Sequence, residues 1–184
     1  IQTMRQTTVD RIRQTVGIHR YEFVGNNGSG SIFNALQPPV DDVRVRRALA
    51  YALPQDAVIE VLGGAGITPA QNQYFNPPSI WFSPLVAQRY PQSNQDEARR
   101  LRNAYVNDRN RSDGKSPGDP VAIEFLCLPD PSLMEVAQVY QAFWRAVGFE
   151  VRLRQVEQAS HIVRVSRDDF MITCWRSGGE ADPY

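Results

Sequence analysis

The side chains best suited to metal binding or nucleophilic chemistry in this sequence are two histidines and two cysteines. His19 and His161 lie far apart and have no partner at the spacing of a metal site, so we expect each to be a surface or capping residue. Cys127 and Cys174 form no short metal or redox motif, and both fall in predicted strands, where a free cysteine behaves as a small buried apolar residue. Export would permit a disulfide between them, but residues on neighbouring strands rarely meet the required geometry, so we expect free thiols.

Two pairs of carboxylates, Asp41-Asp42 and Asp168-Asp169, have the chemistry for acid–base catalysis. Each pair also has a structural explanation, because the first can cap a helix and the second suits a turn. The glycine-rich residues 25–30 suggest a phosphate loop, yet no Gly-Lys-Ser/Thr follows and the next residues predict a strand. We therefore predict no catalytic residue, no metal and no cofactor, and expect that the protein is not an enzyme.

Composition narrows the functional class further. Twenty basic and twenty acidic residues cancel, which disfavours a nucleic-acid partner. A chain of 184 residues that is 42% hydrophobic can bury a core in one globular domain or a little more. No apolar run approaches the roughly 18 residues that a membrane span needs. The sequence starts at Ile1 without a signal peptide and stops without a closing element, so we expect a piece of a longer protein.

Residues 38–64 contain two helix signals in succession. Asp41 or Asp42 can cap the first helix, and the apolar residues along it recur at three- and four-residue spacing: Val45, Ala48, Leu49, Ala52 and Leu53. Pro54 cannot continue that helix but suits the first turn of a second one. The second helix is expected to bury Ala57, Val58, Val61 and Leu62, and to end at Gly63-Gly64.

The rest of the chain predicts alternating strands and helices. Before residue 38 we expect a short helix over 8–16 and strands over 21–24 and 31–36, and beyond residue 64 a long loop over 67–94 and a helix over 95–105. Residues 121–128, 132–147 and 149–155 predict strand, helix and strand, and this connection is long enough for a right-handed crossover between parallel strands. A helix over 158–165 and an apolar strand over 170–175 follow. This order predicts an α/β fold.

The segment around the two helices resembles the C-terminal lobe of the family 5 extracellular solute-binding proteins of dipeptide, oligopeptide and nickel importers. The matching residues are Pro38, Pro39, Asp42, Arg44, Val45, Arg46, Ala48, Leu49 and Ala52, then Gly64, Gly66, Pro69 and Ala70. The resemblance implies a two-lobe, periplasmic-binding-protein-like (type II) fold with a mixed sheet flanked by helices. Residues 31–184 would form most of one lobe, residues 1–30 would belong to the same lobe, and the N-terminal lobe would lie elsewhere in the parent chain.

The same resemblance implies a ligand site after the last strand, because residues 168–183 are similar to the family's final strand, pocket tryptophan and closing Asp-Pro. Trp175 would then pack against the solute, with polar groups supplied by the loop residues Arg176, Ser177, Gly178 and Glu180. Peptide-binding members carry an aspartate at the Gly178 position for the peptide's ammonium group, so a free-amine peptide is disfavoured here unless Glu180 replaces it. Arg176 would favour an acidic or oxygen-rich solute. The alternative for Trp175 is an ordinary core aromatic residue.

By this resemblance the protein captures a peptide-like or other small polar solute between two lobes and delivers it to the membrane permease of an ABC importer. Its location would be periplasmic or extracellular, with membrane association through the importer. Two alternatives stay open: an α/β hydrolase or transferase domain, and a ligand sensor or chaperone that uses the same lobe without transport. A nucleophile and a base that approach each other in a cleft would indicate the hydrolase.

Overall fold

The computed structural model describes residues 6–19, 21, 28–61, 63–64, 70, 73, 75, 79–90 and 92–177. The chain divides into two compact units. Residues 29–54 and 91–175 form the first, which we call the sheet unit, and residues 1–28, 55–90 and 176–184 form the second, which we call the helical unit. The helical unit contains the helices α1 (Gln6–Gln14), α3 (Gln55–Val61) and α4 (Pro84–Arg89).

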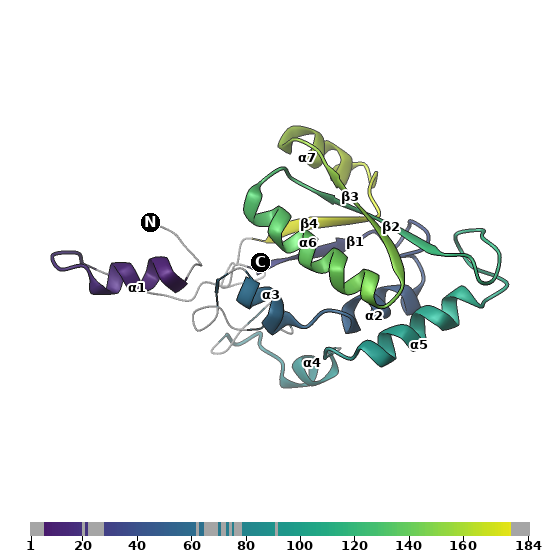
Figure 1. Cartoon of the computed structure of the whole chain (residues 1–184), viewed down its shortest axis with the longest axis horizontal. Coiled ribbons are helices and arrows are strands. Elements are labelled where there is room, and N and C mark those ends of the chain that lie inside the picture. Colours follow the sequence, from purple (N-terminus) through teal and green to yellow (C-terminus); the bar gives the residue numbers. More distant parts are fainter. Residues whose placement is uncertain are drawn as a thin grey trace. The chain divides into compact units, whose positions relative to one another are not determined.

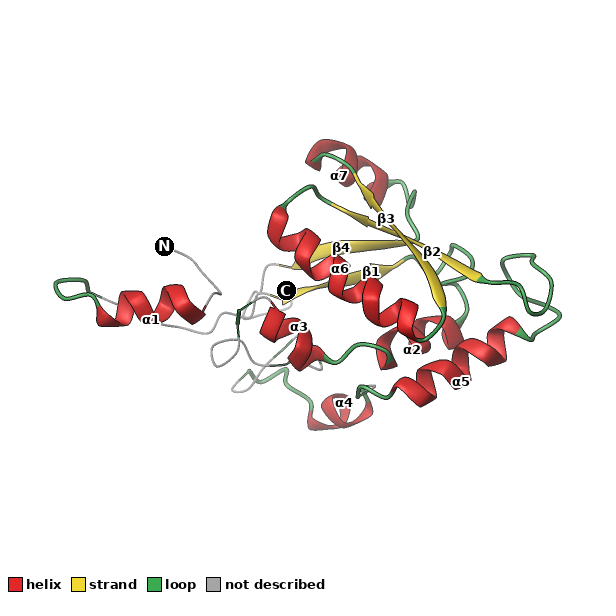
Figure 2. Cartoon of the chain, in the orientation of Figure 1, coloured by secondary structure: helices red, strands yellow, loops and turns green. Residues whose placement is uncertain are grey.

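A four-stranded sheet organises the sheet unit (Figure 2). Its strands lie in the order β1 (Gly28–Phe33), β4 (Ile172–Ser177), β2 (Val121–Cys127) and β3 (Phe149–Gln155). β2 pairs in parallel with both β3 and β4, which confirms the predicted crossover between the strands at 121–128 and 149–155. The amide of Asn34 donates to the carbonyl of Met171 at 3.0 Å, so the end of β1 lies beside the start of β4 and the sheet is mixed.

Three helices bury one face of this sheet: α2 (Val43–Tyr51), α5 (Gln95–Val106) and α6 (Pro131–Ala146). α6 forms the crossover between β2 and β3 and packs on both strands (Figure 1). At the centre, the fully buried indole of Trp144 on α6 lies 5.1 Å from the ring of Phe125 on β2. Its Nε1 donates to the carbonyl of Leu49 at 3.0 Å, which satisfies the only polar atom of the indole and joins α6 to α2.

The opposite face of the sheet carries α7 (Gln158–Ser166). Successive side chains of a strand point to opposite faces, and Ile172 and Cys174 of β4 belong to the core beneath α2, α5 and α6. Thr173 and Trp175 therefore face the other way, where His161 of α7 contacts both of them. This second face is where the candidate site lies.

Local signals account for most helix boundaries. Asp42 caps α2 as predicted, since its Oδ1 accepts from the amide of Arg44 at 2.7 Å. Val45, Ala48, Leu49 and Ala52 are fully buried, as their spacing predicts. In α3, Val58 is buried and Gly63 (φ +66°) follows the helix end, but Val61 is 52% exposed, so the predicted apolar face of this short helix is partly wrong.

Two other predictions need correction. The predicted loop at 67–94 contains α4, because Pro84 stands in its first turn, where the missing amide hydrogen costs nothing. The strand predicted at 170–175 begins at Ile172 instead, since Asp168 (φ +56°) turns the chain just before it, while Phe170 is buried outside the strand. Of the strand predicted at 21–24, residues 22–24 lie outside the described residues.

Candidate ligand-binding site

Trp175 lies near the carboxyl end of β4, with its indole only partly buried. It is therefore not sealed in the core as Trp144 is. Arg176 and Ser177 continue the strand beyond it, and only their backbone is described. Gly178 and Glu180 lie outside the described residues. Of the five residues predicted to bind solute, Trp175 alone can be placed with its side chain.

His161 of α7 lies directly against Trp175. The two ring centroids are 5.9 Å apart and the ring planes meet at 26°, which is a stacked arrangement. His161 is only 3% exposed, so the prediction of a surface or capping residue is wrong for this histidine. The reason is that α7 covers the second face of the sheet, and His161 is the residue of this helix that points into that contact.

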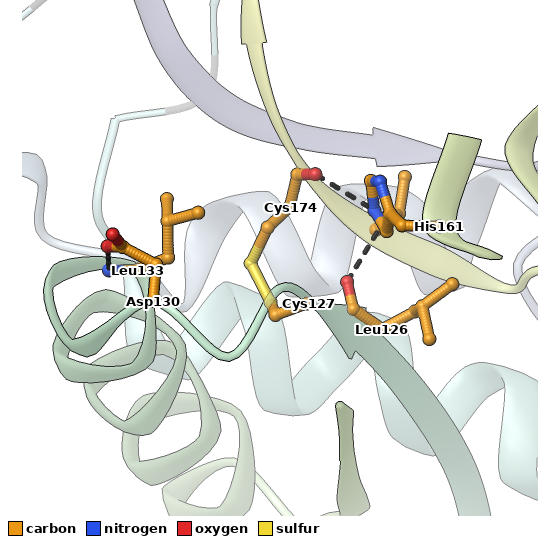
Figure 3. The surroundings of a disulfide bond; sticks show 7 residues. Leu126, Cys127, Asp130, Leu133, His161 and Cys174 are labelled. Carbon is orange, nitrogen blue, oxygen red and sulfur yellow. Dashed lines mark hydrogen bonds between the residues drawn. A yellow bond between two sulfur atoms is a disulfide. The ribbon is translucent and has the colours of Figure 1, made fainter. Parts of the chain in front are cut away.

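A hydrogen-bond chain holds the imidazole in place (Figure 3). The Nε2 atom of His161 lies 2.6 Å from the Oγ1 atom of Thr173, and this hydroxyl lies 3.1 Å from the carbonyl oxygen of Leu126 on β2. The same hydroxyl also lies 3.4 Å from the carbonyl oxygen of Cys174, and the tautomer of the imidazole decides whether Nε2 or Oγ1 donates in their hydrogen bond. Burial lowers the pKa of His161, which favours the neutral ring.

Cys127 and Cys174 form a disulfide, contrary to the expectation of two free thiols (Figure 3). Phe125 pairs with Ile172 and Leu126 with Thr173, so the next pair in the β2–β4 register is the two cysteines. Their Cα atoms are 5.0 Å apart, within the range that a disulfide bridges. The prediction failed because the sequence does not specify which strands are neighbours. The available signal was that both cysteines stand near the carboxyl ends of predicted strands.

Thr173 and His161 are the nearest approach to a nucleophile and a base at this site, and their geometry does not suit catalysis. Thr173 is completely buried, and its hydroxyl lies within hydrogen-bond distance of the carbonyl of Leu126. A nucleophile needs an oxygen that a substrate can reach, and the oxygen of Thr173 is not accessible. The described residues also contain no group of three or more His, Cys, Asp or Glu side chains that could hold a metal ion.

A separate shallow hollow of about 550 Å³ lies over β2 and β3. Its lining includes the charged residues Glu124, Arg145, Glu150 and Arg152 and the apolar residues Ala122 and Met171. Neither Trp175 nor His161 lines it. In the part of the chain that the structure describes, no helix has the length and apolar character needed to cross a membrane.

The full length of the chain, residues 1–184, matches a family described as bacterial extracellular solute-binding proteins, family 5 Middle. The chain belongs to this family. The predicted family 5 membership is thereby confirmed. Two relatives are a dipeptide-binding protein of Escherichia coli strain K12 (27% identical) and heme-binding protein A of Haemophilus influenzae (30% identical). They cover 95% and 86% of this chain, but the chain spans only 31% and 28% of their own length.

Solved structures share the fold of this chain. A dipeptide-binding protein from Pseudoalteromonas sp. SM9913, solved in complex with Met-Leu, matches 98% of this family 5 chain with a TM-score of 0.74 and 18% identity. The match covers 34% of that protein. This likeness confirms the predicted α/β class, with a mixed sheet flanked by helices in a periplasmic-binding-protein-like (type II) fold.

Proposed function

We propose that this family 5 chain is part of the substrate-binding component of an ABC importer. It captures a peptide-like or other small polar solute between two lobes and passes it to the membrane permease. The observation that carries the proposal is the partly exposed indole of Trp175 near the carboxyl end of β4, since ligands in open α/β sheets bind beyond the carboxyl ends of strands. Residues 31–184 form the C-terminal lobe in this proposal, and the N-terminal lobe supplies the opposite wall.

The relatives support a binding role. One relative is named a dipeptide-binding protein and another a heme-binding protein. For this chain, Gly178 stands where an aspartate would pair with a peptide's ammonium group, which disfavours free-amine peptides. Arg176 supports a solute with carboxylate or other oxygen groups, and Glu180 is the candidate replacement for the absent aspartate.

A periplasmic or extracellular location agrees with the disulfide between Cys127 and Cys174. Disulfides persist in oxidising compartments and are rare in the cytosol. Membrane association then arises through the permease. Solute capture itself needs no bond to be made or broken, so we propose that the chain performs no catalysis, in agreement with the complete burial of the Thr173 hydroxyl.

The test is mass spectrometry of the small molecules that co-purify with the full-length parent chain and are released on denaturation. We expect the wild type to retain a solute and Trp175→Ala to lose it, with circular dichroism checking that the variant is folded. Trp81→Ala, which alters a partly exposed tryptophan outside β4, is the matched control and should retain the solute. Retention by Trp175→Ala at the wild-type level would remove the site from β4, and turnover of an added substrate would replace the binding role with an enzymatic one.

A further inference from the structure

We propose that His161 is a positioning residue for solute binding: it holds the indole of Trp175 in the orientation that meets the solute. The inference rests on the proposed function and deepens it. His161 does not touch the solute in this proposal. It acts through Trp175, because its imidazole stacks on the indole and is itself almost completely buried.

The backbone on both sides of this contact is already fixed. β4 is bonded to β2 through the disulfide of Cys174, which lies on the sheet face opposite to His161. The turn between α7 and β4 is held by contacts of Arg164 with Asp169. Arg164 Nε lies 3.0 Å from a carboxylate oxygen of Asp169, and the amide of Asp169 donates to the carbonyl of Arg164 at 2.9 Å. The strand that carries Trp175 therefore has little freedom to shift.

α7 is fixed at its start as well. The carboxylate of Glu157 accepts from the amides of Ala159 and Ser160 at 2.9 and 2.8 Å, which caps the first turn. The hydroxyl of Thr173 then fixes the imidazole through Nε2. With both backbones held, the remaining freedom near the site is rotation of the indole about its own side-chain bonds, and the imidazole restricts that rotation.

Restricting the indole has a consequence for affinity. Immobilising a side chain on binding costs free energy, and a ring that is already oriented has less to lose. Held aromatic side chains are also what a precise binding site requires. Removing the imidazole should therefore weaken binding by about threefold to tenfold without exposing the core.

Three substitutions separate orientation from general packing. His161→Phe keeps an aromatic ring for the stack and loses the contact with Thr173, whose hydroxyl retains the carbonyl of Leu126. His161→Leu keeps apolar bulk without a ring. His161→Gln keeps an N–H group for Thr173 without a ring, and serves as the second variant should His161→Leu fail to fold.

The first measurement needs no ligand. Each protein is labelled with 5-fluorotryptophan and its ¹⁹F NMR signals are recorded, with Trp175→Phe assigning the Trp175 signal. We expect one sharp Trp175 signal in the wild type and in His161→Phe, and a shifted and broadened or split signal in His161→Leu and His161→Gln. The signal of the core residue Trp144 reports folding and should not move. An unchanged Trp175 signal in the two variants without a ring would overturn the inference.

The second measurement is calorimetric titration of the co-purifying solute into the full-length parent chain that carries each of these substitutions. His161→Leu and His161→Gln should bind about threefold to tenfold more weakly than the wild type, and His161→Phe within about twofold. Equal affinities in all four proteins would also overturn the inference. If the NMR contrast appears but the full-length wild type retains no solute, the proposed function fails while the effect of His161 on the indole stands.

Discussion

The disulfide between Cys127 and Cys174 joins two parallel strands one residue before the indole of Trp175. Cys127 is 1% exposed and Cys174 is 6% exposed, so the bridge is buried against the core beneath α2, α5 and α6. On the other face of β4, Thr173 and His161 form the hydrogen bond that fixes α7. The strand that carries the candidate binding residue is therefore held from both faces of the sheet.

Loss of this disulfide should lower the free energy of unfolding by about 2 to 4 kcal/mol, because the bridge closes a loop across a sequence separation of 47 residues. The comparison is urea denaturation of the wild type and Cys127→Ala/Cys174→Ala, with and without dithiothreitol. The wild type should be more stable than the double variant and should lose the difference only when its disulfide is reduced. Identical midpoints for the oxidised wild type and the variant would contradict the prediction.

Stability should fall on mild acidification because of His161. Burial lowers the pKa of His161 below 6.5 in the folded protein, so the unfolded chain binds more protons as the pH falls through about 6.5. Below pH 6.5, proton binding at His161 therefore lowers the free energy of unfolding by at most about 1.4 kcal/mol per pH unit.

The check is urea denaturation at pH 7.5 and 5.5, where His161→Phe should show a smaller loss than the wild type. Carboxylates affect stability only at lower pH. The hydrogen bond from Arg44 is the chief cause that lowers the pKa of Asp42, so the stabilising effect of Asp42 is lost only as the pH falls through and below about 4. The same loss in wild type and His161→Phe between these two pH values would exclude His161 as the cause.

Arg111→Ala should be among the most destabilising substitutions on this chain, at about 3 to 5 kcal/mol. The side chain of Arg111 is completely buried, pairs with Asp113 at 2.7 Å, and donates to the carbonyls of Ser116 and Asp119. Its removal leaves the nearly buried carboxylate of Asp113 without its charged partner, with the amide of Lys115 at 3.3 Å as a remaining donor. Arg99→Ala is the matched control: Arg99 is 45% exposed and pairs with Asp96, so its loss should cost less than about 1 kcal/mol. Equal costs in thermal or urea denaturation would contradict this ranking.

Gly148→Ala should cost more than Gly118→Ala, although both glycines have a positive φ, +97° and +91°. A Cβ atom at Gly118 meets nothing within 4 Å, whereas one at Gly148 lies 2.9 Å from the guanidinium of Arg102. The Arg102 side chain can move, but it then loses its 2.9 Å hydrogen bond to the carbonyl of Gly148, worth about 0.5 to 1.5 kcal/mol. In an Arg102→Ala background the two substitutions should cost the same, and a persisting difference would place the strain elsewhere.

Local features of the sequence were enough to predict most elements. β3 runs over Phe149–Gln155 as predicted, because alternating apolar and polar residues specify a strand with one wet face. Asp42 and the spacing of Val45, Ala48 and Leu49 likewise specify α2, since capping and helical periodicity involve residues within a few positions of one another. The family 5 motif lies in the same segment, so family and fold were both accessible from sequence.

The surroundings of Trp175 were not accessible in this way. The sequence predicted a surface position for His161 and free thiols for the two cysteines. Both predictions were wrong, because the burial of His161 depends on which face of the sheet α7 covers and the disulfide depends on which strands are neighbours. The sequence alone determined most of the elements and the family, through interactions between residues close in the chain. Only the tertiary structure decided that His161 stacks on Trp175 and that Cys127 meets Cys174, because both contacts require β4 to lie beside β2 with α7 on its outer face.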